Sequence, residues 1–165
     1  MTLRLFHSGP PMDVLHEEYP KQGSIDENAP VRACEEVQIN VPVERVWSLL
    51  SDPTTWPSLD ERIHGIRRLS PVEPDGYFHW ANGRSRILSR YAVVEPNREL
   101  TWTGAASGVR AVHRHLLEPV APDQTILRSE ESMSAPFLGL FFPSRKLRVT
   151  LHRWLHAVKT GAEHS

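Results

Sequence analysis

The sequence predicts an α+β fold in which a curved antiparallel β-sheet of about seven strands wraps around a long C-terminal helix, with two short helices after the first strand. Three observations predict it. Short runs of alternating apolar and polar residues recur between residues 61 and 134, brief turn sequences separate them, and one long amphipathic segment follows. Runs joined by such short loops pair as antiparallel neighbours.

Length and composition indicate one globular domain. The chain has 165 residues, of which 39% are hydrophobic and 24% charged, as in ordinary globular proteins. Its net charge of −1 gives no indication of nucleic acid or an anionic membrane as the main partner. No apolar run approaches about 18 residues and the N-terminus lacks a signal-peptide core, so we expect a cytoplasmic protein without integral membrane contact.

Residues 1–30 differ from the rest of the chain. They contain four prolines among scattered glycines and acidic residues, and only 12–19 resembles a helix, too short to be stable alone. We expect an N-terminal extension that is either flexible or packed on the surface of a ligand-binding domain formed by residues 31–163.

The domain is expected to begin with a strand over 31–39, followed by the two short helices. Val43, Val46, Trp47 and Leu50 then recur at helical spacing after Pro42, which is tolerated in a first helical turn. Asp52-Pro53 ends this helix, and 54–59 forms the second short one, interrupted by Pro57.

Six further strands and the long helix complete the predicted order. Asn82-Gly83 is a strong hairpin signal between two of these strands. The long helix covers 144–163, with an apolar stripe that includes Leu151 and Trp154. A bent sheet and a single helix do not fill the space between them, so a cavity is expected. The six strands are predicted at 62–69, 77–82, 84–94, 98–105, 110–118 and 125–133.

Two motifs resemble those of the START-related superfamily, also called the polyketide cyclase/dehydrase and lipid-transport superfamily (SRPBCC). The first is VQINVPVERVWSLLSDPTTWPSL (37–59), and the second is RELTWTGAASGVRAVHRHLLEPVAPDQTILRSEES (98–132). The resemblance covers about 31–160 and implies the helix-grip fold of the birch-pollen allergen, with a polyketide, aromatic or lipid-like ligand. The extension, and Ser134-Ala135-Pro136 where a glycine often stands, depart from the family pattern.

His113, His115 and Glu131 are the candidate catalytic residues. His113 and His115 share one face of a strand with Leu117, which favours an inward position. Of Glu130 and Glu131, alternation turns one inward, where a carboxyl group could act as an acid or base. The alternative is that the histidines are exposed or are hydrogen-bonded core residues, and that the carboxylates belong to a solvated face.

Aromatic and apolar residues are the candidate cavity wall. PFLGLFF (136–142) precedes the long helix and must either be buried or line an opening. Core packing alone would explain these residues equally well. The predicted ligand-binding residues are Trp80, Tyr91, Trp102, Phe137, Phe141, Phe142, Leu151 and Trp154.

No metal or other cofactor is predicted. His113 and His115 could share a metal with His152 and His156, but nothing in the sequence brings the two pairs together. The sequence contains no nucleophile elbow, no P-loop and no dinucleotide fingerprint, and Cys34 lies among charged residues on the first strand.

Three functions remain open at this point. The first is an enzyme of the cyclase, aromatase or dehydratase type that moves protons with His113, His115, or an inward Glu or Arg. The second is a carrier or sensor of a small apolar ligand, and the third is a protein–protein interaction module. The sequence determines neither the ligand nor the oligomeric state.

Overall fold

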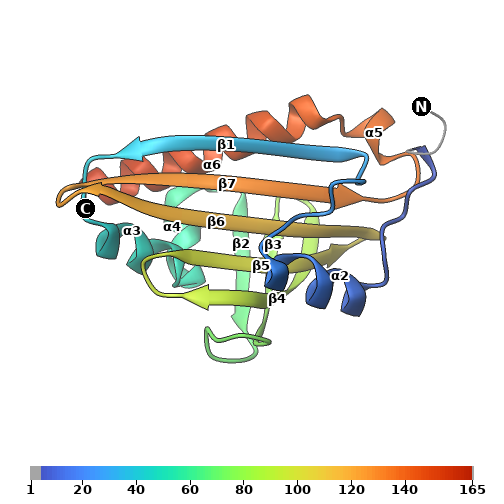
Figure 1. Ribbon diagram of the computed structural model, residues 1–165, viewed down its shortest axis with the longest axis horizontal. Coiled ribbons are helices and arrows are strands. Elements are labelled where there is room, and N and C mark those ends of the chain that lie inside the picture. Colours follow the sequence, from blue (N-terminus) through green and yellow to red (C-terminus); the bar gives the residue numbers. More distant parts are fainter. Residues whose placement is uncertain (1–4, 165) are drawn as a thin grey trace.

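One antiparallel sheet of seven strands forms the body of the structure, a computed structural model that describes residues 5–164 (Figure 1). The strand order is β1-β7-β6-β5-β4-β3-β2, so each strand from β2 to β7 lies beside its neighbour in sequence and β1 closes onto β7. The predicted fold class is therefore confirmed. The strands are β1 (Val31–Ile39), β2 (Ile63–Arg68), β3 (Tyr77–Asn82), β4 (Ser85–Glu95), β5 (Glu99–Ala106), β6 (Val109–Ala121) and β7 (Gln124–Ser134).

The two short helices after β1 are present, but the second differs from the prediction. Helix α3 (Val43–Leu50) is followed by a 3-10 turn, η2 (Pro53–Thr55), and by α4 (Trp56–Leu59). The Asp52 carboxylate caps η2 by accepting the backbone N–H of Thr54 at 3.0 Å. Pro57 stands in the first turn of α4, where no N–H is needed, so it does not interrupt a helix as predicted.

Helix α6 (Ser144–His164) runs along the inner face of the sheet, next to β1 (Figure 1). Its apolar stripe is buried as predicted, with Leu147, Leu151 and Trp154 facing the sheet. A short helix that the sequence did not predict, α5 (Leu138–Phe141), joins β7 to α6. Within residues 5–164, no helix is both long and apolar enough to cross a membrane.

The described part of the N-terminal extension, residues 5–30, packs against the outer face of the sheet. Helix α2 (Met12–Glu18) lies over β5 and β6 and is followed by a 3-10 turn, η1 (Pro20–Gln22). Leu15 and Ile25 form a small apolar cluster with Val112 of β6. The ring of His16 is fully buried and lies 2.8 Å from the Thr103 hydroxyl. That residues 31–163 form a separate domain remains a prediction.

Candidate functional site

Three of the candidate residues occupy one row across the sheet. Trp102 on β5 lies opposite His113 on β6, and His113 lies opposite Glu131 on β7. Directly paired residues of neighbouring strands point to the same face. All three side chains face the interior, where they line the same cavity. The register therefore brings together groups that are 11 to 29 positions apart in the sequence.

The cavity has a volume of about 380 Å³ and an aromatic wall. Four of the chain's five tryptophans line it. The Trp56 indole stacks on Trp102 at 5.3 Å between ring centroids and makes edge-on contacts with Trp80 and Trp154 at 5.7 Å. This wall is preformed because each indole is held by the others. Sequence reasoning placed Trp56 only in a short helix and did not assign it to the cavity.

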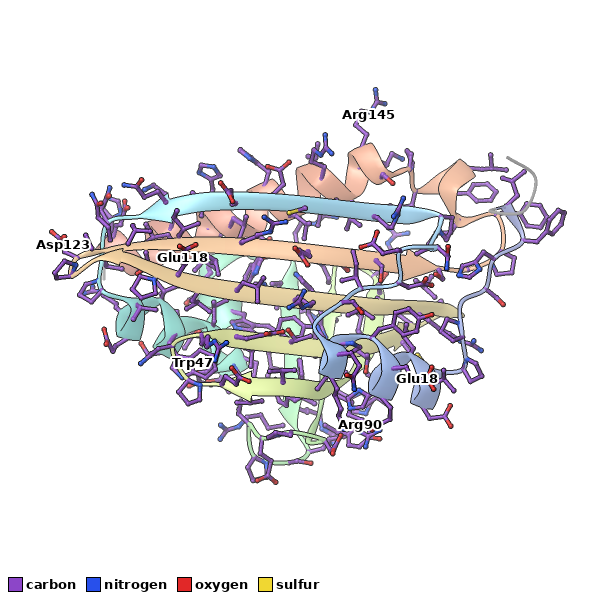
Figure 2. The ribbon with its side chains drawn as sticks, in the orientation of Figure 1. Glu18, Trp47, Arg90, Glu118, Asp123 and Arg145 are labelled. Atoms are coloured by element: carbon purple, nitrogen blue, oxygen red, sulfur yellow. The ribbon has the colours of Figure 1, made fainter. Side chains whose placement is uncertain are left out.

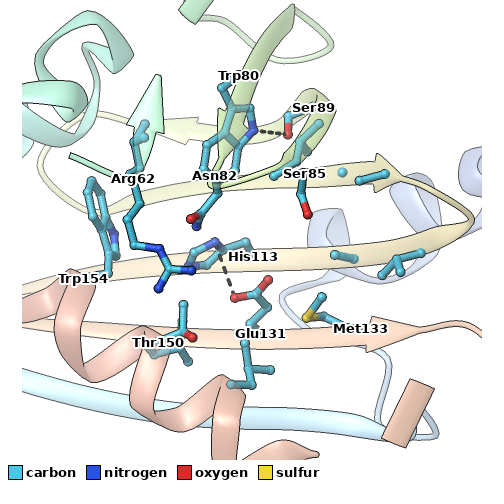
Figure 3. Close-up of a pocket in the computed structure, with 18 of the residues that line it drawn as sticks. Arg62, Trp80, Asn82, Ser85, Ser89, His113, Glu131, Met133, Thr150 and Trp154 are labelled. Atoms are coloured by element: carbon cyan, nitrogen blue, oxygen red, sulfur yellow. Dashed lines mark hydrogen bonds and ion pairs between the residues drawn. The ribbon is translucent and has the colours of Figure 1, made fainter. Parts of the chain in front are cut away.

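Glu131 is the buried acidic group of this cavity. Its side chain is 14% exposed, and its Oε2 atom lies 3.7 Å from Nδ1 of His113 (Figure 3). That distance is longer than a hydrogen bond. Burial disfavours the charged form and raises the pKa of Glu131 to about 8. At neutral pH the carboxyl group is therefore protonated and can donate a proton.

His113 is the second titratable group of the row. It is 8% exposed, and its Nε2 atom is buried with no hydrogen-bond partner among the described residues. Burial, and then the neighbouring His115, hold the pKa of His113 well below its usual value of 6.5. The imidazole is therefore neutral at pH 7 and offers one nitrogen that can accept a proton.

His115 lies deeper than predicted and does not line the cavity. It is fully buried, and its Nε2 accepts the indole N–H of Trp154 at 2.9 Å. Burial lowers the pKa of His115 to about 3, so the ring stays neutral. Its contact orients Trp154, which does line the cavity. In this position the ring of His115 supports the cavity wall through Trp154, and a catalytic role for His115 stays a prediction.

The mouth of the cavity is more polar than its wall. Arg62 extends towards the interior from the segment before β2, and Asn82 and Ser85 come from the β3–β4 hairpin (Figure 3). Asp60 accepts a hydrogen bond from Nε of Arg153 at 3.3 Å at the same opening. Sequence reasoning read Asn82 only as a turn residue and missed this polar mouth, because its parts come from separate loops.

Of the eight predicted wall residues, five line the cavity and three do not. Tyr91 is buried in the core, stacked on Phe78 at 4.6 Å. Phe137 and Phe141 turn outward and are 42% and 76% exposed. Helix α5 has one side towards the cavity and the other towards solvent. Leu138, the first residue of α5, and Phe142, which directly follows it, therefore line the cavity in place of Phe137 and Phe141. The five that line it are Trp80, Trp102, Phe142, Leu151 and Trp154.

The histidine pairs considered for a metal do not converge. His152 and His156 are exposed on α6, whereas His113 and His115 are buried. In residues 5–164, the group of metal-ligating side chains that does converge is His16, Glu17 and Asp75, outside the cavity. Asp75 there already pairs with Lys21 at 2.9 Å and Arg90 at 3.0 Å, and these two cations disfavour a metal.

Comparisons with known proteins agree with this architecture. Comparison with curated proteins gives no significant match. A START superfamily protein from Mycobacterium smegmatis superimposes with a TM-score of 0.70 and 17% identity, over 80% of this chain and 97% of that one. A hypothetical protein from Helicobacter pylori gives a TM-score of 0.75 and 15% identity, over 84% and 91%. Truncated norcoclaurine synthase from Thalictrum flavum gives 0.65 and 12%, over 81% and 94%.

These likenesses to solved structures establish the fold, and the family follows from the sequence. The family model described as "polyketide cyclase / dehydrase and lipid transport" matches residues 30–162, most of the chain. The match covers every strand of the sheet and nearly all of α6. The chain belongs to the polyketide cyclase/dehydrase and lipid-transport family.

Proposed function

We propose that the protein binds a small apolar molecule that carries a carbonyl group, and that Glu131 and His113 move protons on it in a reaction of the cyclase, aromatase or dehydratase type. One observation carries the proposal: a carboxyl group that burial keeps protonated faces a tryptophan-lined cavity, beside a neutral imidazole. A cavity that only had to hold an apolar ligand would need neither group.

The dimensions and lining of the cavity support a ligand of this kind. A volume of about 380 Å³ lies within the range of small-molecule sites, which are mostly apolar with a few polar groups that fix orientation. Family membership supports a hydrophobic ligand. The four indoles favour a flat or aromatic molecule, because stacked and edge-on contacts are specific to planar rings.

The proposed proton transfer is balanced within the pair. The protonated carboxyl of Glu131 donates its proton to the carbonyl oxygen, while an unprotonated nitrogen of His113 takes a proton from the adjacent carbon. The carbonyl compound becomes an enol, and the neutral pair becomes a carboxylate beside an imidazolium, which attract each other at 3.7 Å. Return of both protons to the ligand carbon and to Glu131 restores the neutral pair. In a dehydration, the imidazolium of His113 gives its proton to a hydroxyl that leaves as water, and the enol returns its O–H proton to Glu131.

Hydrogen–deuterium exchange of a simple aryl ketone tests this chemistry without knowledge of the natural substrate. Benzylacetone is incubated in D2O with the protein, and loss of the signals next to the carbonyl is followed by proton NMR. We expect catalysed exchange, reduced by about 100-fold or more in Glu131→Gln. Quenching of tryptophan fluorescence by the ketone should show that the variant still binds it.

Glu130→Gln is the matched control. It changes the adjacent residue of the same strand, whose side chain pairs with Arg114 and Arg128 outside the cavity. It should leave the exchange rate unchanged in protein that remains folded, as judged by circular dichroism. Exchange that is equal in the wild type and Glu131→Gln, with binding intact in both, would contradict the proposal and indicate a carrier.

A further inference from the structure

A group of exposed apolar side chains lies at one place, beside the segment that lines the cavity with Leu138 and Phe142. Within residues 5–164, nine large apolar side chains are exposed, and four of them come from the N-terminal segment and the β7–α6 connection. We call Phe6, Phe137, Leu140 and Phe141 the apolar lip. Phe6 and Phe137 contact each other edge-on at 5.1 Å, and Leu140 and Phe141 are 65% and 76% exposed. A patch of this kind on a soluble domain indicates a surface that meets an apolar partner.

The backbone holds the lip in this outward position. Phe137 has a φ of 61°, a left-handed conformation that is unfavourable for a bulky residue. Its N–H donates to the carbonyl of Leu5 at 2.7 Å, which ties the N-terminal segment to the lip. The strained residue therefore presents its ring to solvent next to Phe6.

Positive charges border the lip, and the surrounding segment carries no carboxylate. Residues 135–162 contain five Lys and Arg and no Asp or Glu, although the whole chain has a net charge of −1. Arg145, Lys146 and Arg148 are exposed in the first turns of α6. Of these, Arg148 pairs with Glu35 of the neighbouring strand β1 at 3.4 Å. Lys146 donates to the backbone carbonyl of Phe141 at 3.4 Å, so a cation is held at the backbone of an exposed lip residue. Figure 2 shows Arg145 projecting away from the molecule at this end of α6.

We infer that the apolar lip and these three cations dock the protein on the surface of a bilayer that contains anionic phospholipid. Aromatic and leucine side chains enter the boundary between headgroups and acyl chains, while Lys and Arg meet the phosphates. Charge complementarity selects this partner. A second copy of the chain, placed lip to lip, would bring its own three cations against these.

The apolar lip lies where docking on a bilayer could deliver a ligand to the cavity. Leu138 and Phe142 line the cavity from the same connection that exposes Leu140 and Phe141. A bilayer in contact with the lip therefore lies next to the part of the cavity that Leu138 and Phe142 line. An apolar molecule dissolved in the bilayer reaches the tryptophan wall along these residues without crossing water. This inference concerns how a ligand arrives and does not depend on the proton chemistry proposed above.

Vesicle co-sedimentation tests the inference with the full-length chain. Vesicles of phosphatidylcholine alone are compared with vesicles that also contain phosphatidylserine. We expect the wild type to partition onto the anionic vesicles and to dissociate at high salt. Phe141→Ser and Leu140→Ser should each lower the partition coefficient by about 10-fold, and Arg145→Gln and Lys146→Gln by about 5-fold each.

Two control substitutions match these changes away from the lip. Val120→Ser replaces another exposed apolar residue, 47% exposed, in β6 near the β6–β7 turn. This turn contains Asp123, which lies at the left end of the view in Figure 2, whereas Arg145 lies to the right of the centre. Arg98→Gln replaces an exposed cation that pairs with Glu95. Both controls should bind anionic vesicles as the wild type does.

Either of two results would overturn the inference. One is a wild type that does not sediment with anionic vesicles; if it also dimerises in analytical ultracentrifugation and Phe141→Ser abolishes the dimer, the lip joins two copies. The other is equal loss of vesicle binding in the lip variants and in Val120→Ser, which would show that the lip has no special part in it.

Discussion

The outer and inner faces of strands β6 and β7 differ in how they compensate the charge of a glutamate. Glu130 and Glu131 are consecutive, yet Glu130 points to the outer face and Glu131 into the cavity. Glu130 accepts from Arg114 at 3.0 Å and from Arg128 at 3.0 Å. Glu131 has a neutral histidine 3.7 Å away. The outer carboxylate is neutralised by partners, and the inner one by a proton.

This difference separates a structural role from a chemical one. On the outer face, Arg114 lies between Glu99 and Glu130 and beneath the N-terminal extension, so each charge of the group is compensated. On the inner face, no Lys or Arg within residues 5–164 pairs with Glu131, and both Glu131 and His113 stay neutral, so that both can still exchange protons. Titratable groups that burial leaves without compensation are the ones available for chemistry.

The largest effect is expected from removing the outer cation. Arg114→Ala leaves Glu99 and Glu130 without their shared partner at positions that are 14% and 18% exposed. Loss of one partner from a buried ion pair typically costs about 3–5 kcal/mol. We expect the free energy of unfolding in urea to fall by about 3 kcal/mol. Arg98→Ala, whose side chain is 81% exposed, should change it by less than about 0.5 kcal/mol. If Arg114→Ala and Arg98→Ala lowered the free energy of unfolding equally, the buried ion pairs of Arg114 would not contribute more to stability than an exposed one.

The ionisation of Glu131 on the inner face should make the free energy of unfolding depend on pH. The pKa of Glu131 is raised from 4.5 to about 8, so the folded chain binds one more proton than the unfolded chain between these values. Stability therefore falls as pH rises, by about 1.4 kcal/mol per pH unit, until pH 8 is passed. His113 and His115, with lowered pKa values, act in the opposite direction, but only below pH 6.5.

Between pH 6.5 and 8 the Glu131 contribution is therefore separated from theirs. The wild type should lose about 2 kcal/mol relative to Glu131→Gln across this interval, because glutamine cannot ionise. Urea unfolding at a series of pH values measures the difference, and Glu130→Gln provides the outer-face comparison. Parallel pH profiles for the wild type and Glu131→Gln would show that Glu131 is ionised in the folded protein.

The smallest change in the free energy of unfolding is expected from removing the hydrogen bond between Trp154 and His115. Trp154→Phe removes the indole N–H that His115 Nε2 accepts at 2.9 Å and leaves a buried acceptor unpaired. We expect a loss of about 1 kcal/mol in unfolding free energy. Because Phe is also smaller than Trp, the hydrogen bond is isolated by a double-mutant cycle with His115→Leu. A coupling energy near zero would mean that the contact does not position Trp154.

Much of the fold was predictable because its signals are local. Two-residue alternation placed His113 on an inward face, and helical spacing placed Leu151 and Trp154 on the buried side of α6. Alternation could not decide between Glu130 and Glu131, since a shift of one residue reverses the face. The site as a constellation was not predictable for the same reason: pairing of β5, β6 and β7 brings its members together.

The sequence by itself determined the order of the elements, the faces of most strands and the family, because these depend on neighbouring residues and on motifs. Only the tertiary structure decided that His115 supports Trp154, that Trp56 completes the wall, and that residues 5–30 cover the outer face. It also decided where charge lies, since the net charge of −1 conceals a cationic α6 beside an apolar lip. Burial and charge distribution depend on packing between segments that are distant in the sequence, so they cannot be predicted from local sequence patterns.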